Sequence, residues 1–215
     1  MKQVAAPGTP TSARLRSPAA WARLIIGLAG FGVSVDLMVN SGLGLGPWDA
    51  FHVGLSARTG ITIGTASILV GIGIVAFSWT IGIRPGVGTL VNMVLIGWFI
   101  DRFRPWTPRP PSYAWGYPFY IAAILICGLS TGLYISAGLG KGPRDGLILG
   151  LVDRTRWPVR RVRTLVELGA LGFGWWMGGP VGVGTLLFAF GIGPAMQWGL
   201  QVCGVHHGER PATEP

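Results

Sequence analysis

The sequence predicts an all-α polytopic membrane protein built from two homologous halves, and three observations carry this prediction. Half of the 215 residues are hydrophobic and only 12% are charged, which is about half the charged share of a globular domain. Apolar runs of the length of a bilayer span recur along the chain. A glycine-rich stretch occurs twice at an offset of 96 residues, as GLGLGPWD from Gly42 to Asp49 and as GLGKGPRD from Gly138 to Asp145.

Six apolar segments have the length that a bilayer crossing needs, which is about 20 residues. We expect a disordered basic N-terminal tail before them over residues 1–20, and a polar C-terminal tail after them over residues 204–215. The membrane repeats then cover residues 21–110 and 111–203. The predicted spans are residues 21–41, 62–82, 86–103, 115–136, 162–179 and 183–203.

Two helix-like segments between these spans, residues 47–58 and 143–154, are too short to cross about 30 Å of hydrocarbon. Without them each half has three spans, so the second half enters the membrane from the opposite side. The halves are then inverted repeats, as in many secondary transporters. If the short segments do cross, the chain has eight spans and parallel repeats. The positive-inside rule places both termini in the cytoplasm in either scheme, and helix length favours six spans.

The repeat extends well beyond its glycine-rich stretch. Residues 32–90 align with residues 128–186 without a gap, and roughly two positions in five are identical. A second shared motif, GVGTL, closes each copy at residues 86–90 and 182–186. This register predicts that the two halves share one fold.

The repeated stretches predict a turn followed by a broken helix. Glycine allows a sharp turn, proline suits the first turn of a new helix, and aspartate in that turn complements the helix dipole. Two interpretations stay open: a packing turn whose aspartates only cap helices, or irregular backbone that presents N–H and C=O groups to a substrate. The motif residues are Gly42, Gly44, Gly46 and Pro47 in the first copy and Gly138, Gly140, Gly142 and Pro143 in the second.

Four side chains are candidates for binding a substrate or a coupling ion. Asp36 lies late in the first span, where an ionisable group usually faces a cavity, so it is a candidate for proton or cation coupling. Hydration at the membrane interface is the alternative for Asp36. Asp49 and Asp145 close the two repeated stretches. His52 can share a helix face with Asp49, as part of a proton relay or as an isolated interfacial histidine.

The sequence carries no motif for catalysis, metal binding or cofactor binding. It has no Ser-His-Asp set, no spacing typical of metal ligands, and no Lys-Ser/Thr pair of a nucleotide-binding loop. The net charge of +9 comes from arginines between apolar runs and in the tails, which is typical of membrane topology and not of nucleic-acid binding. We therefore expect no enzyme activity, no catalytic residue, no metal, no cofactor and no nucleic-acid partner.

A near-N-terminal span leads into GLGLGPWD, then into TGITIG at residues 59–64, and then into GVGTL and a further span. This series resembles the YczE/YyaS/YitT family of bacterial integral membrane proteins over about residues 20–203. The resemblance implies a multi-pass bacterial membrane protein. It implies no settled activity, so no binding or catalytic residue is transferred from it. The second copy departs from the motif with Arg144 in place of Trp48.

These observations place the protein in the bacterial plasma membrane, with the lipid bilayer as its environment. The leading hypothesis is a transporter or permease for a small solute or ion, with its site between the two repeats. The alternative is a non-transporting accessory or regulatory protein that packs against a membrane partner protein or a second copy of itself. Its natural contact is the basic stretch from Arg154 to Arg163, which can also bind anionic lipid headgroups.

Overall fold

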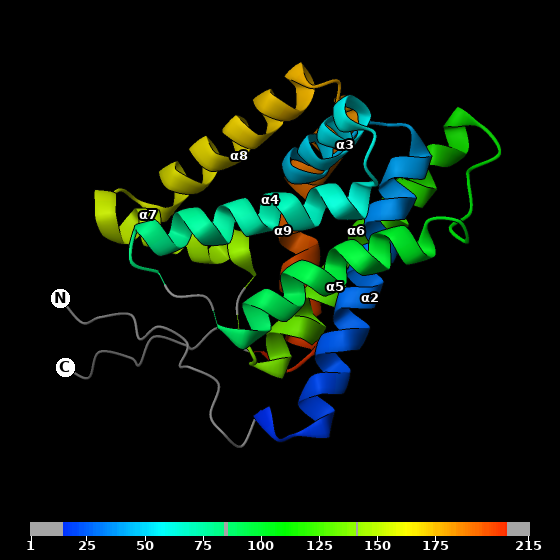
Figure 1. Cartoon of the computed structure of the whole chain (residues 1–215). Coiled ribbons are helices and arrows are strands. Elements are labelled where there is room, and N and C mark those ends of the chain that lie inside the picture. Colours follow the sequence, from blue (N-terminus) through cyan, green and yellow to red (C-terminus); the bar gives the residue numbers. More distant parts are fainter. Residues whose placement is uncertain (1–14, 84–85, 141, 206–215) are drawn as a thin grey trace, which may run out of the picture.

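Figure 1 shows the computed structural model of the chain, which describes residues 15–83, 86–140 and 142–205. These residues form eight α-helices and no strands, so the all-α prediction is confirmed. The helices are α2 (Pro18–Ser41), α3 (Pro47–Thr59), α4 (Ile63–Thr80), α5 (Val87–Phe103), α6 (Tyr113–Ala137), α7 (Pro143–Thr155), α8 (Val159–Trp176) and α9 (Val183–Val202).

The first helix begins earlier than predicted. Pro18 is its first residue, and the Ser17 side chain caps it by accepting a hydrogen bond from the Ala20 N–H at 3.4 Å. Proline at this position loses no hydrogen bond, because the first N–H groups of a helix have no partner within it. The predicted N-terminal tail therefore ends before residue 18. Residues 1–14 and 206–215 of the two predicted tails lie outside the described residues.

Four helices in the described ranges, α2, α4, α6 and α9, are long and apolar enough to cross a membrane. The predicted spans over residues 86–103 and 162–179 correspond to α5 and α8, which are not among these four. Helix α5 has 17 residues. The first turns of α8 carry Arg160, Arg161 and Arg163, followed by Glu167. Length and charge therefore separate these two helices from the other four.

The two longest helices, α2 and α6, pack antiparallel to each other. Near one end of the pair, a Cβ at Gly27 would lie 2.8 Å from the Ser130 carbonyl oxygen. Near the other end, a Cβ at Gly116 would lie 2.7 Å from the Ser41 carbonyl oxygen. Glycine at both contacts lets the backbones approach closely.

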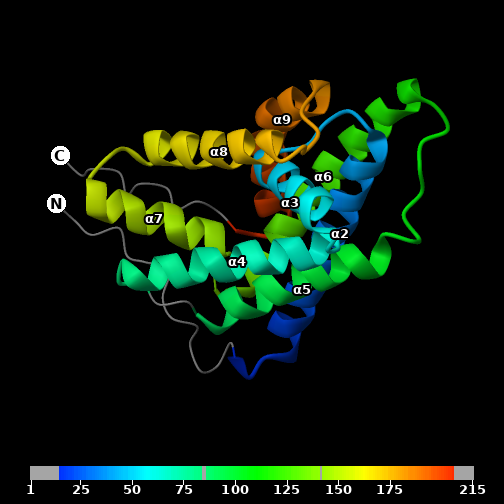
Figure 2. The same ribbon diagram turned by 45° about the horizontal axis from the view of Figure 1, so that its top comes forward.

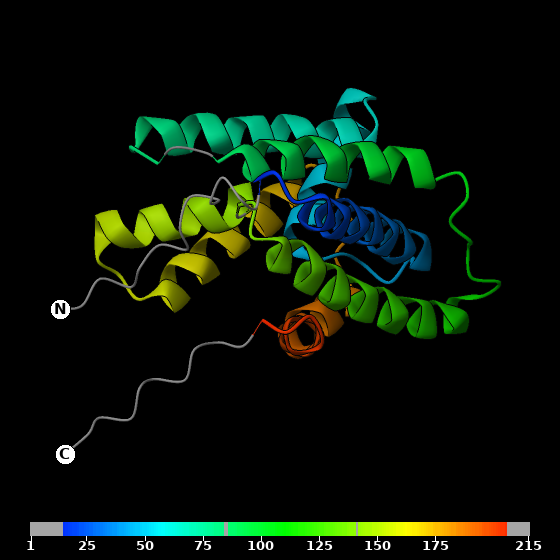
Figure 3. The same ribbon diagram turned by 90° about the horizontal axis from the view of Figure 1, so that it is seen from below.

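Helix α5 packs along α2, and α9 packs along α6 (Figures 1 and 3). Gly32 of α2 lies against Phe99 and Ile100 of α5, and Gly128 of α6 lies against Ala195 of α9. A core without room for larger side chains forms along these contacts. Its most deeply buried residues include Leu24, Leu28, Met38, Ile100, Tyr120 and Ala123.

The short helices α3 and α7 end on opposite sides of the bundle. Helix α3 follows the C-terminus of α2 and leads into α4, whose Gly64 N–H donates to the Asp101 carboxylate near the C-terminus of α5 (2.9 Å). Helix α7 starts where Gly140 approaches Gly88 at the N-terminus of α5, and it ends near Gly82 at the C-terminus of α4. We call these two sides the α3 end and the α7 end. Neither short helix runs from one end to the other.

The helix bounds of the two halves correspond at the offset of 96 residues. Helices α3 and α4 match α7 and α8 in both bounds, and α5 and α9 start at equivalent positions. Helix α3 packs on α8 of the other half, and α7 packs on α4 (Figure 2). The equivalent helices α2 and α6 run antiparallel, which is the direction that inverted repeats require. The inversion itself stays a prediction, and labelling tests it.

Single cysteines in place of Ala57 and Asp153 are expected to react from opposite sides of the membrane, because both positions are exposed and α3 and α7 lie at opposite ends. The measurement is labelling of intact cells with a membrane-impermeant thiol reagent, after replacement of Cys127 and Cys203. A cysteine at Ser112, in the exposed connection before α6, serves as the reference for the α3 end. Reaction of positions 57 and 153 from the same side contradicts the inverted arrangement.

Candidate functional site

The two glycine-rich stretches join the halves through their backbones. The Gly184 N–H at the start of α9 donates to the Leu43 carbonyl (2.7 Å), and the Gly88 N–H at the start of α5 donates to the Leu139 carbonyl (3.2 Å). Gly44 has a φ of 101°, and a side chain there would overlap the backbone of residue 182. Each glycine-rich stretch thus packs on the GVGTL motif of the other half, as the packing-turn interpretation expects.

Helix α3 presents Asp49 and His52 to the protein interior. Gly46 is the N-cap and Pro47 the first residue, so Asp49 lies in the first turn. Asp49 is 6% exposed and His52 is 2% exposed. His52 Nδ1 lies 3.9 Å from Asp49 Oδ1, so the two side chains share one face of the helix. Among the described residues, His52 Nδ1 and the nearby Tyr120 hydroxyl have no hydrogen-bond partner.

Arg144 joins the starts of the two short helices. It is the second residue of α7, and its guanidinium carbon lies 4.9 Å from the centre of the Trp48 ring in α3. Its charge interacts electrostatically with the carboxylates of both Asp49 and Asp145. The indole ring and the two negative charges both favour the guanidinium at this position. The structure therefore brings Asp49, His52 and Asp145 into one polar cluster, which we call the central cluster, with Arg144 in it.

Arg144 is the member of the central cluster that sequence reasoning missed. Its position in the second copy is the one that Trp48 occupies in the first, and this difference marked it only as a departure from the motif. Its charge also fitted the positive-inside pattern, which explains most arginines of membrane proteins. One signal in the sequence could have identified Arg144. Arginine and tryptophan occupy equivalent positions of the two copies, and their side chains can stack where the two equivalent helices meet.

The central cluster also contains buried groups from α6. Cys127 is 4% exposed and interacts electrostatically with Asp49 and Arg144. Thr131 is 2% exposed, and its hydroxyl donates to the Cys127 carbonyl at 2.8 Å. Cys127 therefore places a native thiol beside the charged residues, where its reactivity reports access to the cluster.

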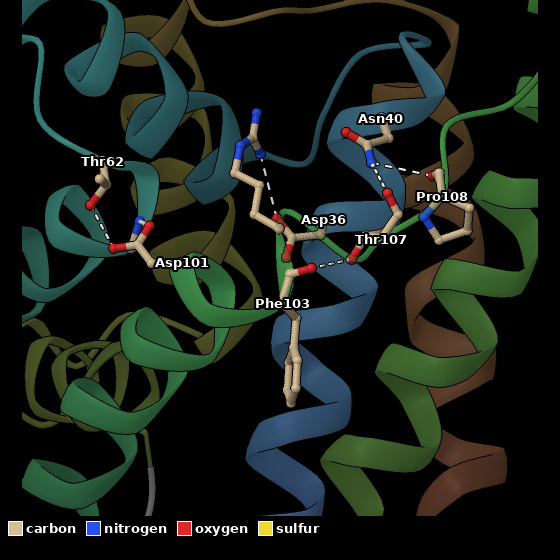
Figure 4. A network of polar contacts seen from close by, with 9 residues as sticks. Asp36, Asn40, Thr62, Asp101, Phe103, Thr107 and Pro108 are labelled. Carbon is tan, nitrogen blue, oxygen red and sulfur yellow. Dashed lines mark hydrogen bonds and ion pairs between the residues drawn. The ribbon is translucent and has the colours of Figure 1, made fainter.

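Asp36 lies outside the central cluster. Its side chain is fully buried, and Oδ1 lies 3.4 Å from the Arg104 guanidinium at the C-terminus of α5 (Figure 4). Asp101, also near the C-terminus of α5, acts electrostatically on it. The structure thus does not bring Asp36 together with the other three candidates. It belongs to a second polar group at the α3 end.

Two shallow surface hollows among the described residues lie away from the central cluster. One is lined by Ala114, Trp115 and Pro118. The other lies over residues 157–165 at the start of α8. Within the same part of the chain, no three His, Cys, Asp or Glu side chains are arranged to hold a metal ion. Within the cluster Asp49 and His52 are buried, whereas Arg144 and Asp145 are partly exposed.

Replacing Trp48 with leucine is expected to destabilise the protein by about 1 kcal/mol, because the Arg144 guanidinium loses its aromatic partner. Replacing Trp48 with phenylalanine keeps an aromatic face and is expected to cost less. Thermal unfolding of the two variants in the same detergent compares them. If leucine and phenylalanine destabilise the protein equally, Trp48 contributes through the size of its side chain and not through the cation–π contact.

Comparison with known proteins places this arrangement in a bacterial family. One relative is the uncharacterized membrane protein YczE of Bacillus subtilis (strain 168), 42% identical over 171 residues that cover 79% of each chain. An uncharacterized protein of Haemophilus influenzae (strain ATCC 51907 / DSM 11121 / KW20 / Rd) is 34% identical over 83% of this chain and 82% of its own. The uncharacterized protein YyaS of Bacillus subtilis is 28% identical over 75% of this chain and 83% of its own. No solved structure matches the chain.

These similarities confirm the resemblance that the glycine-rich motifs indicate. The four apolar helices and the relative named as a membrane protein agree, so the chain is a membrane protein in contact with the lipid bilayer. A family model matches residues 19–200, which include all of the helices described above except the first residue of α2 and the end of α9. The chain belongs to that family, the family of unknown function DUF6198.

Proposed function

We propose that the protein is a transporter for a small solute or ion, and that the substrate binds between the starts of α3 and α7. The observation that carries the proposal is the position of Arg144, which interacts with a carboxylate from each half of the chain. Charged groups within membrane proteins are costly and concentrate at substrate and ion pathways. A site shared by two equivalent short helices is also what transporters with broken helices use.

The central cluster supplies complementary chemistry for binding. The Arg144 guanidinium suits an anionic group such as a carboxylate or phosphate. Asp49 and Asp145 suit a cationic group or a proton. A solute with an acidic group can replace one aspartate as the partner of Arg144 and release that aspartate to take up a proton or cation. The proposal assigns binding and release to the site, and no chemical reaction.

Transport requires a conformation in which water reaches the buried residues of the central cluster, Asp49, His52 and Cys127. The described conformation is packed there, so the proposal implies that helices at one end move apart. We assign the α7 end to the cytoplasm of a bacterial plasma membrane, together with both chain termini. The support for this orientation is the basic stretch from Arg154 to Arg163 at the α7 end, where residues 153–161 are exposed.

The native thiol of Cys127 tests the proposal without knowledge of the substrate. In a protein with Cys203 replaced by serine, Cys127 is expected to react with a small charged methanethiosulfonate in membrane vesicles, because transient opening exposes the cluster. The matched control is a cysteine at Ala123, a fully buried core position one turn earlier in α6, in a protein with Cys127 replaced by alanine. Equal rates at both positions, both limited by unfolding, contradict transport through this cluster.

Equal labelling rates at positions 127 and 123 would favour the accessory function, which a separate observation also supports. Helix α8 is exposed along most of its length, with Phe173, Trp175 and Trp176 each more than half exposed. Together with the basic start of α8, this gives one face that suits a partner protein or anionic lipid headgroups. An accessory protein needs this face and no access to Cys127.

A further inference from the structure

The two halves of the chain differ in one helix contact. Helices α4 and α5 of the first half pack side by side (Figures 1 and 3). The equivalent helices α8 and α9 make no comparable contact in the described part of the chain. The same sequence unit therefore adopts two arrangements in one molecule, closed in the first half and open in the second.

Glycine contacts show this difference at single positions. A Cβ at Gly97 of α5 would lie 2.5 Å from the Gly64 carbonyl oxygen of α4, whereas the equivalent Gly193 of α9 has nothing within 4 Å. Ser67 follows Gly64 by one turn on the same face of α4 and is 9% exposed. Its equivalent on α8, Arg163, is 49% exposed. The face that is buried in α4 is thus open in α8.

Polar contacts at the α3 end hold α5 to α4 in the first half. The Asp101 carboxylate at the C-terminal end of α5 accepts hydrogen bonds from the Thr62 hydroxyl (2.5 Å) and from the Gly64 N–H (2.9 Å). The positions equivalent to Asp101 and Thr62 are Gln197, which carries no charge, and Pro158, which has no hydroxyl to donate. The closed half therefore carries a charged attachment that the open half lacks.

A second set of contacts attaches the end of α5 to α2 (Figure 4). Arg104 pairs with Asp36 at 3.4 Å, and the Asn40 side chain donates to the Thr107 and Pro108 carbonyls at 3.1 and 3.2 Å. We call the Asp101, Arg104 and Asn40 contacts the clasp. Arg104 is 39% exposed, and Asp36 Oδ2 has no partner among the described residues. Solvent therefore reaches Arg104 in the clasp. The buried Asp36 carboxylate has a hydrogen-bond partner at only one of its two oxygens, which favours release of the contact.

We propose that α4 and α5 form a gate at the α3 end, and that the clasp holds it closed. Opening separates α4 from α5 into the arrangement that α8 and α9 show. It uncovers the faces of α4 and α5 that cover each other in the closed state, while α5 stays packed on α2 as α9 stays packed on α6. The purpose of such a gate rests on the proposed transport function, since it would admit solute toward the central cluster. Whether the gate exists is tested by the separation of α4 from α5 alone, independently of transport.

The experiment measures how often the gate opens. In a protein without native cysteines, Ser67→Cys reacts with a small methanethiosulfonate only when α4 leaves α5. Replacing Asp101 with glutamine, the residue of the open half, removes charged hydrogen bonds, so we expect the labelling rate to rise about tenfold. Asp153→Asn removes an exposed carboxylate at the end of α7 and is expected to leave the rate unchanged.

A disulfide across the gate provides the second measurement. A Cβ at Gly71 would lie 3.6 Å from the Met93 Cβ, close to the mean Cβ separation of a disulfide. Oxidation of the Gly71→Cys, Met93→Cys pair is expected to abolish the increase caused by Asp101→Gln. An unchanged rate in Asp101→Gln, or an increase that persists with the disulfide closed, overturns the gate.

The two tests have separable outcomes. A gate that opens while Cys127 stays unreactive contradicts the transport site and leaves the gate intact. A reactive Cys127 together with an unchanged Ser67→Cys rate refutes the gate and leaves the transport proposal, with access from another side.

Discussion

Replacing Arg144 with glutamine is expected to destabilise the protein by about 3 kcal/mol. The change removes a positive charge that interacts with the carboxylates of both Asp49 and Asp145. Removing one partner of a buried charge pair leaves the other charge uncompensated, which costs about 3–5 kcal/mol when burial is complete. Arg144 is half-buried, so we expect the lower end of that range. The measurement is the midpoint of unfolding of the purified protein in mixed detergent micelles.

A second substitution distinguishes lost charge from lost packing at Arg144. Adding Asp49→Asn to Arg144→Gln removes the carboxylate that is left without its partner, so stability is expected to return in part. Arg160→Gln, at an exposed position near the start of α8, serves as the matched control and is expected to change stability by less than about 0.5 kcal/mol. If Arg144→Gln is as stable as Arg160→Gln, the charge interactions at the central cluster do not support the fold.

Replacing Gly184 with alanine is expected to destabilise the protein by about 3 kcal/mol, by forcing the two halves apart. A Cβ there would lie 2.5 Å from the Gly44 carbonyl oxygen and 2.8 Å from Cε2 of Tyr120. The Gly44 contact is backbone, which cannot rotate away, so the cost lies at the upper end of about 1–3 kcal/mol for overpacking. The hydrogen bond from the Gly184 N–H to Leu43 is strained by the same displacement.

Helix α9 itself provides the control for this prediction. Gly193→Ala adds the same methyl group in the same helix, at a position with nothing within 4 Å. Alanine is the better helix former by about 1 kcal/mol in water, so this variant is expected to be neutral or slightly more stable. Thermal unfolding in one detergent compares the two variants. Equal effects of Gly184→Ala and Gly193→Ala would show that the contact between the motifs does not limit stability.

The helices were predictable because their signals are local. Apolar runs mark the long helices, and Pro47 and Pro143 begin the short ones as predicted. Proline at the first position and glycine before it act through the backbone of their own segment. The spans predicted over α5 and α8 are not among the four helices that are long and apolar enough to cross a membrane.

The candidate site was predictable only in part. Asp49, His52 and Asp145 were identified from the repeated motif and from helical spacing, and the structure brings them together. Asp36 was grouped with them because it is an aspartate in a span, but its partner is Arg104 on α5. Arg144 was missed, because a charge near a helix end is explained equally well by topology. Which carboxylate an arginine meets depends on contacts between helices that are distant in sequence.

The helical class, the membrane setting and the start of each short helix could be predicted from the sequence, since composition, periodicity and backbone preference act over a few neighbouring residues. The sequence did not predict that the Gly184 N–H binds the Leu43 carbonyl of the other half, or that Arg144 interacts with two aspartates. It also did not predict that α4 packs on α5 while α8 stands apart from α9. These are long-range contacts, and their energies depend on how whole helices pack. Two halves with equivalent sequences can therefore differ in packing, and the clasp residues Asp101 and Thr62 show where that difference arises.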